Sequence, residues 1–108
     1  MKVTSASMKI SLIIPVHNGG SDFRRMLRAV RAGSRHPDEI LVVDDASTDR
    51  SAEYARETGA RVFSTGGTPA GPASARNLGA GKARGSLLVF LDADVLPHRG
   101  TLEKIEKA

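Results

Sequence analysis

The chain has 108 residues, of which 40% are hydrophobic and 26% charged, with a net charge of +4 and no cysteine. This length suits one α/β domain with a single core, and the composition argues against a disordered or fibrous protein. No apolar run approaches the roughly 18 residues of a membrane-spanning helix, residues 1–9 lack the apolar core of a signal peptide, and the absence of cysteine excludes disulfides and thiolate metal sites. A cytoplasmic location is expected.

The predicted elements alternate between strands and helices. Residues 1–7 are small and polar and are predicted to form a loose tail, and residues 8–108 are predicted to form one domain. Pro15 is expected to end the first strand because it has no N–H for a ladder, and Ser21 or Asp22 is expected to cap the first helix. Strands are predicted at 9–15, 40–43, 61–64 and 86–91, and helices at 22–32, 47–58, 73–84 and 101–107.

The last predicted strand ends in two acids. Leu87–Leu91 is a continuous apolar run, typical of a strand that is buried on both faces. Asp92 and Asp94 follow it two residues apart, so their side chains leave an extended backbone on the same side. Two neighbouring carboxylates favour a hard divalent cation, Mg²⁺ or Mn²⁺, whose shell is completed by phosphate oxygens. The alternative is a solvated loop in which Asp94 is a helix-start acid.

The alternation of elements predicts an α/β fold, a Rossmann-like three-layer sandwich with a mainly parallel sheet of about four strands. Ligands of such sheets bind beyond the carboxyl ends of the strands. Polar residues collect at these ends in three places: Pro15 to Asn18, Asp44 with Asp45, and Asp92 with Asp94. We therefore expect three loops to converge on one ligand.

Other motifs are less informative. No G-x-G-x-x-G follows the first strand, and Arg76 stands where a P-loop ending at Gly81-Lys82 requires glycine. Asp44 and Asp45 could form only a turn with a helix cap. No second histidine stands at ligand spacing from His17, and His36 and His98 are interpreted as surface residues. Arg76 and Asn77 are expected near the start of the third helix, where they can reach an anionic ligand.

Four arginines, at positions 24, 28, 31 and 35, are predicted to line one face of the first helix. Such a face can meet an acidic membrane surface, so peripheral contact with the inner membrane is one hypothesis, although a solvated helix face is the commoner outcome. Nucleic acid is not expected as a partner, because the chain has almost no aromatic residues to stack on bases.

Four segments resemble the family 2 glycosyltransferases of the GT-A fold, in the family's order and spacing. They are Ser11–Asn18, Ile40–Asp49, Gly71–Gly79 and Leu88–Asp94. The resemblance covers nearly all of residues 8–108 and implies the strand order 3-2-1-4 of the nucleotide-binding half. Two departures are His17, where the family often has tyrosine, and Ala46, where it commonly has glycine.

The resemblance also implies a ligand, a nucleotide-diphospho-sugar of the UDP or GDP type. The loop after the first strand and Asp45 would hold its nucleobase and ribose, and Asp92 would face the ribose or the metal. Asp94, the last acid of the family's DxD motif, would ligate Mg²⁺ or Mn²⁺ bridging the diphosphate. The residues expected to line this site are Pro15, Val16, His17, Asn18, Asp44, Asp45, Arg76, Asn77 and Asp92, with Asp94 and Asp92 as the metal ligands.

The family supplies its catalytic carboxylate from a second half that follows the DxD strand, and this sequence stops one helix beyond Asp94. No catalytic residue is therefore predicted. We expect these 108 residues, a piece of a longer protein or a short natural one, to be the donor-binding half, which binds the donor weakly and transfers no sugar unaided. An uncovered sheet edge beside the fourth strand is expected to allow self-association.

Two other functions compete with this interpretation. One is a non-catalytic nucleotide-binding or scaffold domain that pairs with a partner through the uncovered edge. The other is a nucleotidyltransferase, which shares the sheet and the metal but needs a basic glycine-rich loop directly after the first strand. The sequence has neutral residues there, so this function ranks well behind.

Overall fold

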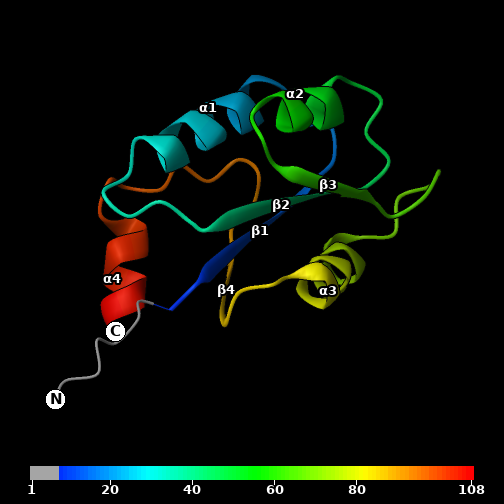
Figure 1. Ribbon diagram of the computed structural model, residues 1–108. Coiled ribbons are helices and arrows are strands. Elements are labelled where there is room, and N and C mark those ends of the chain that lie inside the picture. The colour runs from blue at the N-terminus through cyan, green and yellow to red at the C-terminus, as the bar shows by residue number, and fades with distance from the viewer. Residues whose placement is uncertain (1–7) are drawn as a thin grey trace, which may run out of the picture.

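The computed structural model describes residues 8–108, so the predicted tail, residues 1–7, lies outside the described residues. A four-stranded parallel sheet of order β3-β2-β1-β4 lies between layers of helices (Figure 1). The elements are β1 (Ile10–Val16), α1 (Gly20–Arg31), β2 (Glu39–Asp44), α2 (Ser51–Glu57), β3 (Arg61–Ser64), α3 (Pro72–Lys82), β4 (Leu87–Phe90) and α4 (Thr101–Lys107). The predicted fold class and strand order are confirmed. None of the described helices is long and apolar enough to cross a membrane.

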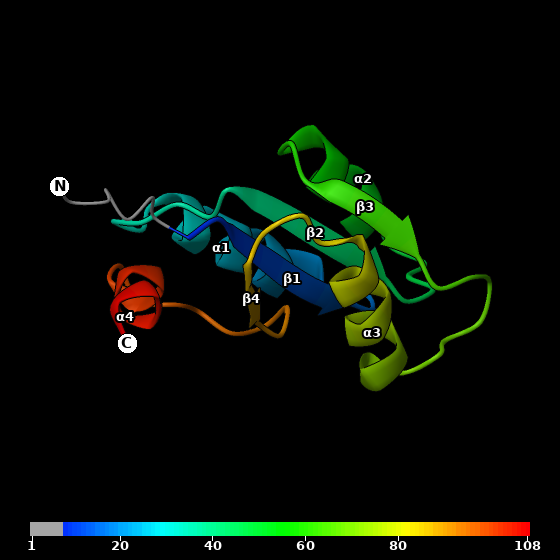
Figure 2. The same ribbon diagram turned by 60° about the horizontal axis from the view of Figure 1, so that its bottom comes forward.

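The core has two parts, one on each face of the sheet. α1 and α2 cover one face and α3 the other (Figure 2). Phe23, Met26 and Leu27 of α1 are fully buried, and each contributes about 1.5–3 kcal/mol by the usual transfer scale. On the other face, a Cβ at Gly79 would lie 2.5 Å from a methyl group of Ile13, so the glycine allows α3 to approach β1 closely.

The prediction that Pro15 ends the first strand is wrong. Pro15 lies within β1, opposite Val43 of β2. Ile13 O accepts a hydrogen bond from Leu91 N on the β4 side, whereas Val16 O accepts one from Asp45 N on the β2 side. Because backbone groups alternate between the two sides of a strand, the nitrogen of Pro15 faces the β4 side. β4 has already ended there, so the missing N–H breaks no ladder.

The first two helices begin elsewhere than predicted, because the loops after β1 and β2 bond to each other. α1 begins at Gly20, and its N-terminal amides are capped by Asp49 and by Ser51, the first residue of α2, rather than by Ser21 or Asp22. Gly19 N donates to Ser51 Oγ at 3.1 Å and Gly20 N to Asp49 Oδ2 at 3.1 Å. α2 is correspondingly shorter than predicted and begins at Ser51.

The prediction that the fourth strand is buried on both faces is wrong. β4 is an edge strand, and Leu88 and Phe90 are 36% and 40% exposed. They share the face of Ile13, but α3 packs on β1 and β2 and leaves β4 bare on that side. In α4, Leu102 is buried as expected, whereas Ile105 is 37% exposed.

The predicted arginine face is also only partly formed. α1 ends at Arg31, so Arg35 lies beyond the helix. The Arg24 guanidinium lies 4.8 Å from the ring centroid of Tyr54, and Arg31 donates to Thr58 O. These two arginines therefore bind α2 and the turn after it instead of lining a free basic surface.

Candidate functional site

Two adjoining hollows lie at the carboxyl ends of the strands. The first, which we call the Asp45 hollow, has a volume of about 280 Å³ and is lined by Pro15, Val16, His17, Asp45, Pro69, Pro72, Ala75 and Asp92. The second, the Asp94 hollow, has about 320 Å³ and is lined by His17, Asn18, Gly19, Asp22, Ala93 and Asp94. His17 lines both. The loops after β1, β2 and β4 thus meet, as the sequence predicts.

Asn18 and the backbone carbonyl of Asp45 bind the two ring nitrogens of His17. Asn18 Oδ1 accepts hydrogen bonds from Thr48 N at 2.7 Å and Asp49 N at 3.2 Å, which settles the orientation of the amide. The amide Nδ2 therefore donates to His17 Nε2 at 3.4 Å, and His17 Nδ1 donates to Asp45 O at 2.7 Å. The ring is held at the boundary of the two hollows by both of its nitrogens.

Asp45 is buried, and its carboxylate organises the glycine- and proline-rich loop before α3. Oδ1 accepts from Ala70 N at 2.7 Å and Thr65 Oγ1 at 2.6 Å, and Oδ2 accepts from Gly71 N at 2.9 Å. The backbone donor of Ala70, with the Thr65 hydroxyl, holds the pKa of Asp45 below its ordinary value. Asp45 therefore closes the loop that carries Pro69 over the hollow.

Asp92 and Asp94 are both exposed at the turn after β4. Asp92 Oδ1 pairs with Arg76 Nη2 at 3.2 Å, and the two side chains are 61% and 40% exposed, so water screens the pair. Within residues 8–108 the Asp94 carboxylate has no ion-pair partner, and it opens onto its hollow. Arg76 lies in the second turn of α3 because the helix begins at Pro72, earlier than predicted.

The acids of this turn fit a divalent cation that arrives with a phosphate ligand. Among residues 8–108, no group of three or more His, Cys, Asp or Glu could hold a metal alone. Mg²⁺ and related ions are commonly bound through one or two carboxylates, with waters and substrate phosphates completing the shell. Asp92 and Asp94, both exposed and each on one of the two adjoining hollows, can supply such carboxylates, but they are too few to hold a metal ion without other ligands.

Three predicted site residues line neither hollow: Asp44, Arg76 and Asn77, of which Arg76 reaches the site only through its pair with Asp92. Asp44 Oδ1 accepts from Ser47 N at 3.2 Å and stabilises the turn after β2, and Asn77 is exposed on α3. Some residues that hold the loops together were not predicted from the sequence. Ser47 Oγ accepts from Asn18 N at 2.9 Å, alongside the Asp49 and Ser51 contacts with Gly20 and Gly19. The run of polar residues after β2, from Ser47 to Ser51, was the signal in the sequence that could have indicated these contacts.

A larger hollow, of about 360 Å³, lies at the amino ends of the strands between Lys9, Glu39, Arg61 and Arg84. Its partly buried acid is already engaged: Glu39 accepts from Ser11 Oγ, Arg84 N and Arg61 Nη1 at 2.6–2.7 Å. These bonds join the starts of β1, β2 and β3 to the end of α3. We interpret this end of the sheet as structural and the carboxyl end as the functional one.

A sheet of this order, flanked by helices and with acids at the carboxyl ends of its strands, defines an α/β domain of the GT-A type. The family model described as glycosyl transferase family 2 matches residues 11–108. The chain belongs to this family.

Two curated relatives are themselves glycosyltransferases. The 4,4'-diaponeurosporenoate glycosyltransferase of Staphylococcus haemolyticus is 38% identical over 105 residues, which cover 92% of this chain and 28% of that protein. Glycosyltransferase AglE of Haloferax volcanii is 34% identical over 113 residues, covering 94% of this chain and 36% of AglE. The chain thus spans about a third of the length of these relatives.

Two solved structures of glycosyltransferases have a similar fold. TarS 1-349 of S. aureus in complex with UDP-GlcNAc has a TM-score of 0.83 and 26% identity, covering 93% of this chain and 30% of that one. The mannosyltransferase PcManGT of Pyrobaculum calidifontis, in complex with GDP-Man and Mn²⁺, has a TM-score of 0.77 and 29% identity, covering 91% and 31%.

Ala46 follows the paired acids in a left-handed conformation, with φ at 60°. For an L-residue with a Cβ this costs about 1–2 kcal/mol, which explains why glycine suits this position. We expect Ala46→Gly to stabilise the fold by about 0.5–1 kcal/mol in urea unfolding, since the strain removed exceeds the added chain entropy. The control Ala29→Gly, inside α1, should lose about 1 kcal/mol; equal losses for both variants would contradict the strain argument.

The lowered pKa of Asp45 predicts a pH-dependent contribution to stability. A carboxyl whose pKa is depressed by folding stabilises the protein above its unfolded pKa, about 3.9, and loses that contribution as the pH falls through its folded pKa. The difference in unfolding free energy between wild type and Asp45→Asn should therefore shrink as the pH falls from about 5 to about 3.

Thr65→Val removes one hydrogen-bond donor to Asp45 but keeps the Asp45 carboxyl group. This variant should therefore retain most of the pH dependence of the unfolding free energy. Urea titrations at each pH provide the measurement. A wild-type-to-Asp45→Asn difference that stays constant over this range would show that the carboxylate is not stabilised by its loop donors.

Proposed function

We propose that these residues form the donor site of a family 2 glycosyltransferase, which binds a nucleotide-diphospho-sugar together with Mn²⁺ or Mg²⁺. The observation that carries the proposal is the meeting of His17, Asp45 and Asp94, from three separate loops, around two hollows that share His17. Structural relatives in complex with UDP-GlcNAc or with GDP-Man and Mn²⁺ support it.

Each side of the site has a distinct role in this proposal. The Asp45 hollow, with its prolines and the face of His17, takes the nucleobase and ribose, because its lining is mostly apolar and it is closed by the 65–71 loop. Asp94, on its own hollow, and Asp92, on the Asp45 hollow, are the proposed contacts to the diphosphate from the turn after β4. When bound, a divalent ion supplies positive charge for the diphosphate leaving group. Arg76 adds a cation beside Asp92.

We do not expect sugar transfer from these 108 residues alone. An inverting transferase needs a carboxylate to deprotonate the acceptor hydroxyl. Of the acids that line the hollows, Asp45 is held by the loop donors, Asp92 and Asp94 face the metal side, and Asp22 pairs with Arg25 at 3.8 Å. The carboxylate that would act on the acceptor is therefore expected from another part of a complete enzyme.

Calorimetric titration with UDP and GDP, with and without Mn²⁺, tests donor binding. We expect one of these nucleotides to bind, and to bind more tightly with Mn²⁺ present. Asp94→Ala should weaken nucleotide binding in the presence of Mn²⁺ by about 10–100-fold, since the loss of an outer-shell partner already costs a metal site that much. Binding without Mn²⁺ should not change.

The matched control is Asp22→Asn, a second exposed acid on the same hollow, which should keep the Mn²⁺ effect. An equal loss of the Mn²⁺ effect in both variants would mean that the net charge of the hollow attracts the ion and that Asp94 does not ligate it. Absence of heat with every nucleotide would remove the proposal.

The bare face of β4 supports a second candidate, a scaffold domain that associates with a copy of itself or with a partner. Leu88 and Phe90 are exposed on an edge strand whose outer backbone groups have no partner strand in the sheet. Exposed apolar edges of this kind favour strand addition or association.

Light scattering over a concentration series tests association. We expect concentration-dependent dimers, and we expect Phe90→Lys to abolish them by placing a charge on the bare face. Asp94→Ala should leave association unchanged, because that acid lies beyond the strand. A monomeric profile at all concentrations would eliminate the scaffold function and the predicted self-association.

A further inference from the structure

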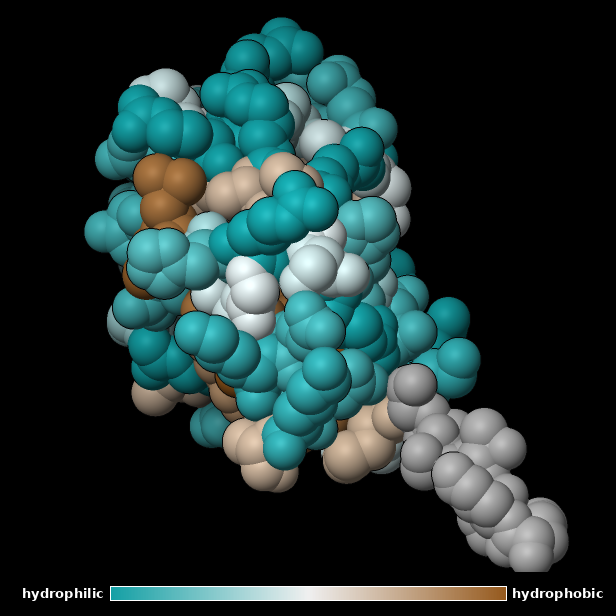
Figure 3. Space-filling model, turned by 90° about the vertical axis from the view of Figure 1, so that its left-hand side faces the viewer, coloured by the Kyte–Doolittle hydropathy of each residue, from teal (hydrophilic) through white to brown (hydrophobic). Residues whose placement is uncertain are grey.

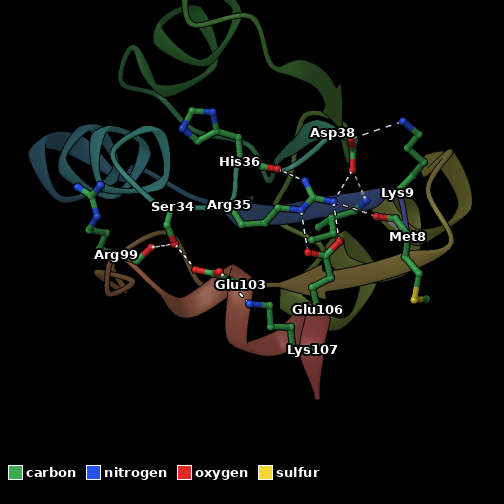
Figure 4. Close-up of polar contacts among 11 residues, drawn as sticks. Met8, Lys9, Ser34, Arg35, His36, Asp38, Arg99, Glu103, Glu106 and Lys107 are labelled. Atoms are coloured by element: carbon green, nitrogen blue, oxygen red, sulfur yellow. Dashed lines mark hydrogen bonds and ion pairs between the residues drawn. The ribbon is translucent and has the colours of Figure 1, made fainter. Parts of the chain in front are cut away.

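A cluster of polar contacts lies at the opposite end of the molecule, where the loop after α1 meets α4 (Figure 4). Arg35 binds both carboxylate oxygens of Glu106, from Nε at 3.1 Å and Nη2 at 3.2 Å. Its Nη2 also lies 3.1 Å from Asp38 Oδ2 and 2.9 Å from Met8 O. Arg35 therefore joins α4 to the beginnings of β1 and β2.

Ser34 holds the segment that precedes α4. Ser34 N donates to Arg99 O at 2.8 Å, and Ser34 Oγ lies 2.8 Å from Glu103 Oε1 and 3.2 Å from Arg99 O. Gly33 allows this approach, because a Cβ there would lie 3.2 Å from Arg99 O. We call Ser34 and Arg35, with their partners Arg99, Glu103 and Glu106, the α4 clamp.

Ion pairs of this cluster are better shielded from water than a typical surface pair. The side chains of Arg35 and Glu106 are 19% and 18% exposed, although the molecular surface on the side of α4 is mostly hydrophilic (Figure 3). A two-pronged arginine–carboxylate contact also fixes the direction of both side chains. The clamp is therefore a rigid attachment of α4, and not a pair of mobile surface charges.

The clamped segment is the direct continuation of the turn that carries Asp92 and Asp94. Leu91 N donates to Ile13 O and Val95 N to Asp92 O, so the turn is fixed to the sheet on its upstream side. Downstream, Pro97, His98 and Arg99 pack on α1 with a residual space of only about 10 Å³. Val95 and Leu96, both exposed, are the only residues between Asp94 and this packed part.

We propose that Ser34 and Arg35 are positioning residues for the metal-binding turn, although they lie at the other end of the sheet. Asp94 has no side-chain partner of its own among the described residues, so the backbone on either side determines where its carboxylate lies. The clamp fixes the downstream side. This inference rests on the proposed function, because it assumes that Asp94 ligates the metal.

The test measures Mn²⁺ binding by electron paramagnetic resonance at saturating UDP or GDP, whichever binds, in the 108-residue chain. Glu106→Ala removes the link from Arg35 to α4 and leaves the contacts of Arg35 with Asp38 and Met8. We expect this variant, and Ser34→Ala, to weaken Mn²⁺ binding about 5–10-fold, less than the loss of an immediate outer-shell partner. Lys107→Met, which removes only an exposed pair with Glu103, is the control and should bind as wild type.

Amide hydrogen exchange separates positioning from a general loss of stability. In Glu106→Ala and Ser34→Ala, residues 92–96 should exchange faster while residues 65–71 keep their wild-type rates. Uniformly faster exchange, or unchanged Mn²⁺ binding in folded variants, would overturn the proposal. If the wild-type chain binds no Mn²⁺ with either nucleotide, the proposed function fails, and the exchange rates of residues 92–96 still decide whether the clamp holds the turn.

Discussion

The parallel pairing of β1 with both of its neighbours is the constraint on which the site depends. Because β2, β1 and β4 run in the same direction, the loops that follow them leave the sheet at one edge. β1 is buried on both faces, so its register is strongly specified: a slip of one residue would exchange Ile13, on the α3 side, with Ile14, on the α1 side. His17, Asp45 and Asp94 are therefore brought together by backbone hydrogen bonds and burial, and not by contacts among themselves.

The acids of this fold divide into two groups according to whether backbone N–H groups bind them. Asp38 accepts from Ile10 N and Asp45 from Ala70 N, and in each case this bond is the main cause of a lowered pKa. Their negative charge is already stabilised within the protein, and their function is to connect strands and loops. Within residues 8–108, no backbone N–H binds the carboxylate of Asp92 or Asp94; both are exposed, and Asp92 pairs only with the exposed Arg76 side chain. A ligand cation interacts most favourably with carboxylates whose charge is not already stabilised by backbone donors.

The sequence was sufficient for the order and type of all eight elements, since β1, β2 and β4 each contain an apolar run, β3 has Val62 and Phe63 between a glycine-ended helix and a glycine-rich loop, and each helix has its own stripe or terminating glycine. It was also sufficient for the meeting of three loops. It was not sufficient for features that arise between distant segments. The start of α1 depends on Asp49 and Ser51, and the role of Asp45 as a loop anchor depends on Ala70 and Gly71. An apolar run such as β4 also looks the same whether its strand is central or at the edge.

His17 illustrates how one departure from the family pattern can be accommodated by its surroundings. A tyrosine at this position has no ring N–H to donate to Asp45 O, whereas the imidazole does so and accepts from Asn18 at its other nitrogen. A continuous chain of hydrogen bonds consequently runs from Thr48 N through Asn18 and His17 to the backbone of Asp45, whose side chain holds the 65–71 loop. The ring is fixed at both nitrogens before any ligand arrives. A ligand that packs against its face therefore meets a preformed wall, and less of the binding free energy is spent on ordering the site.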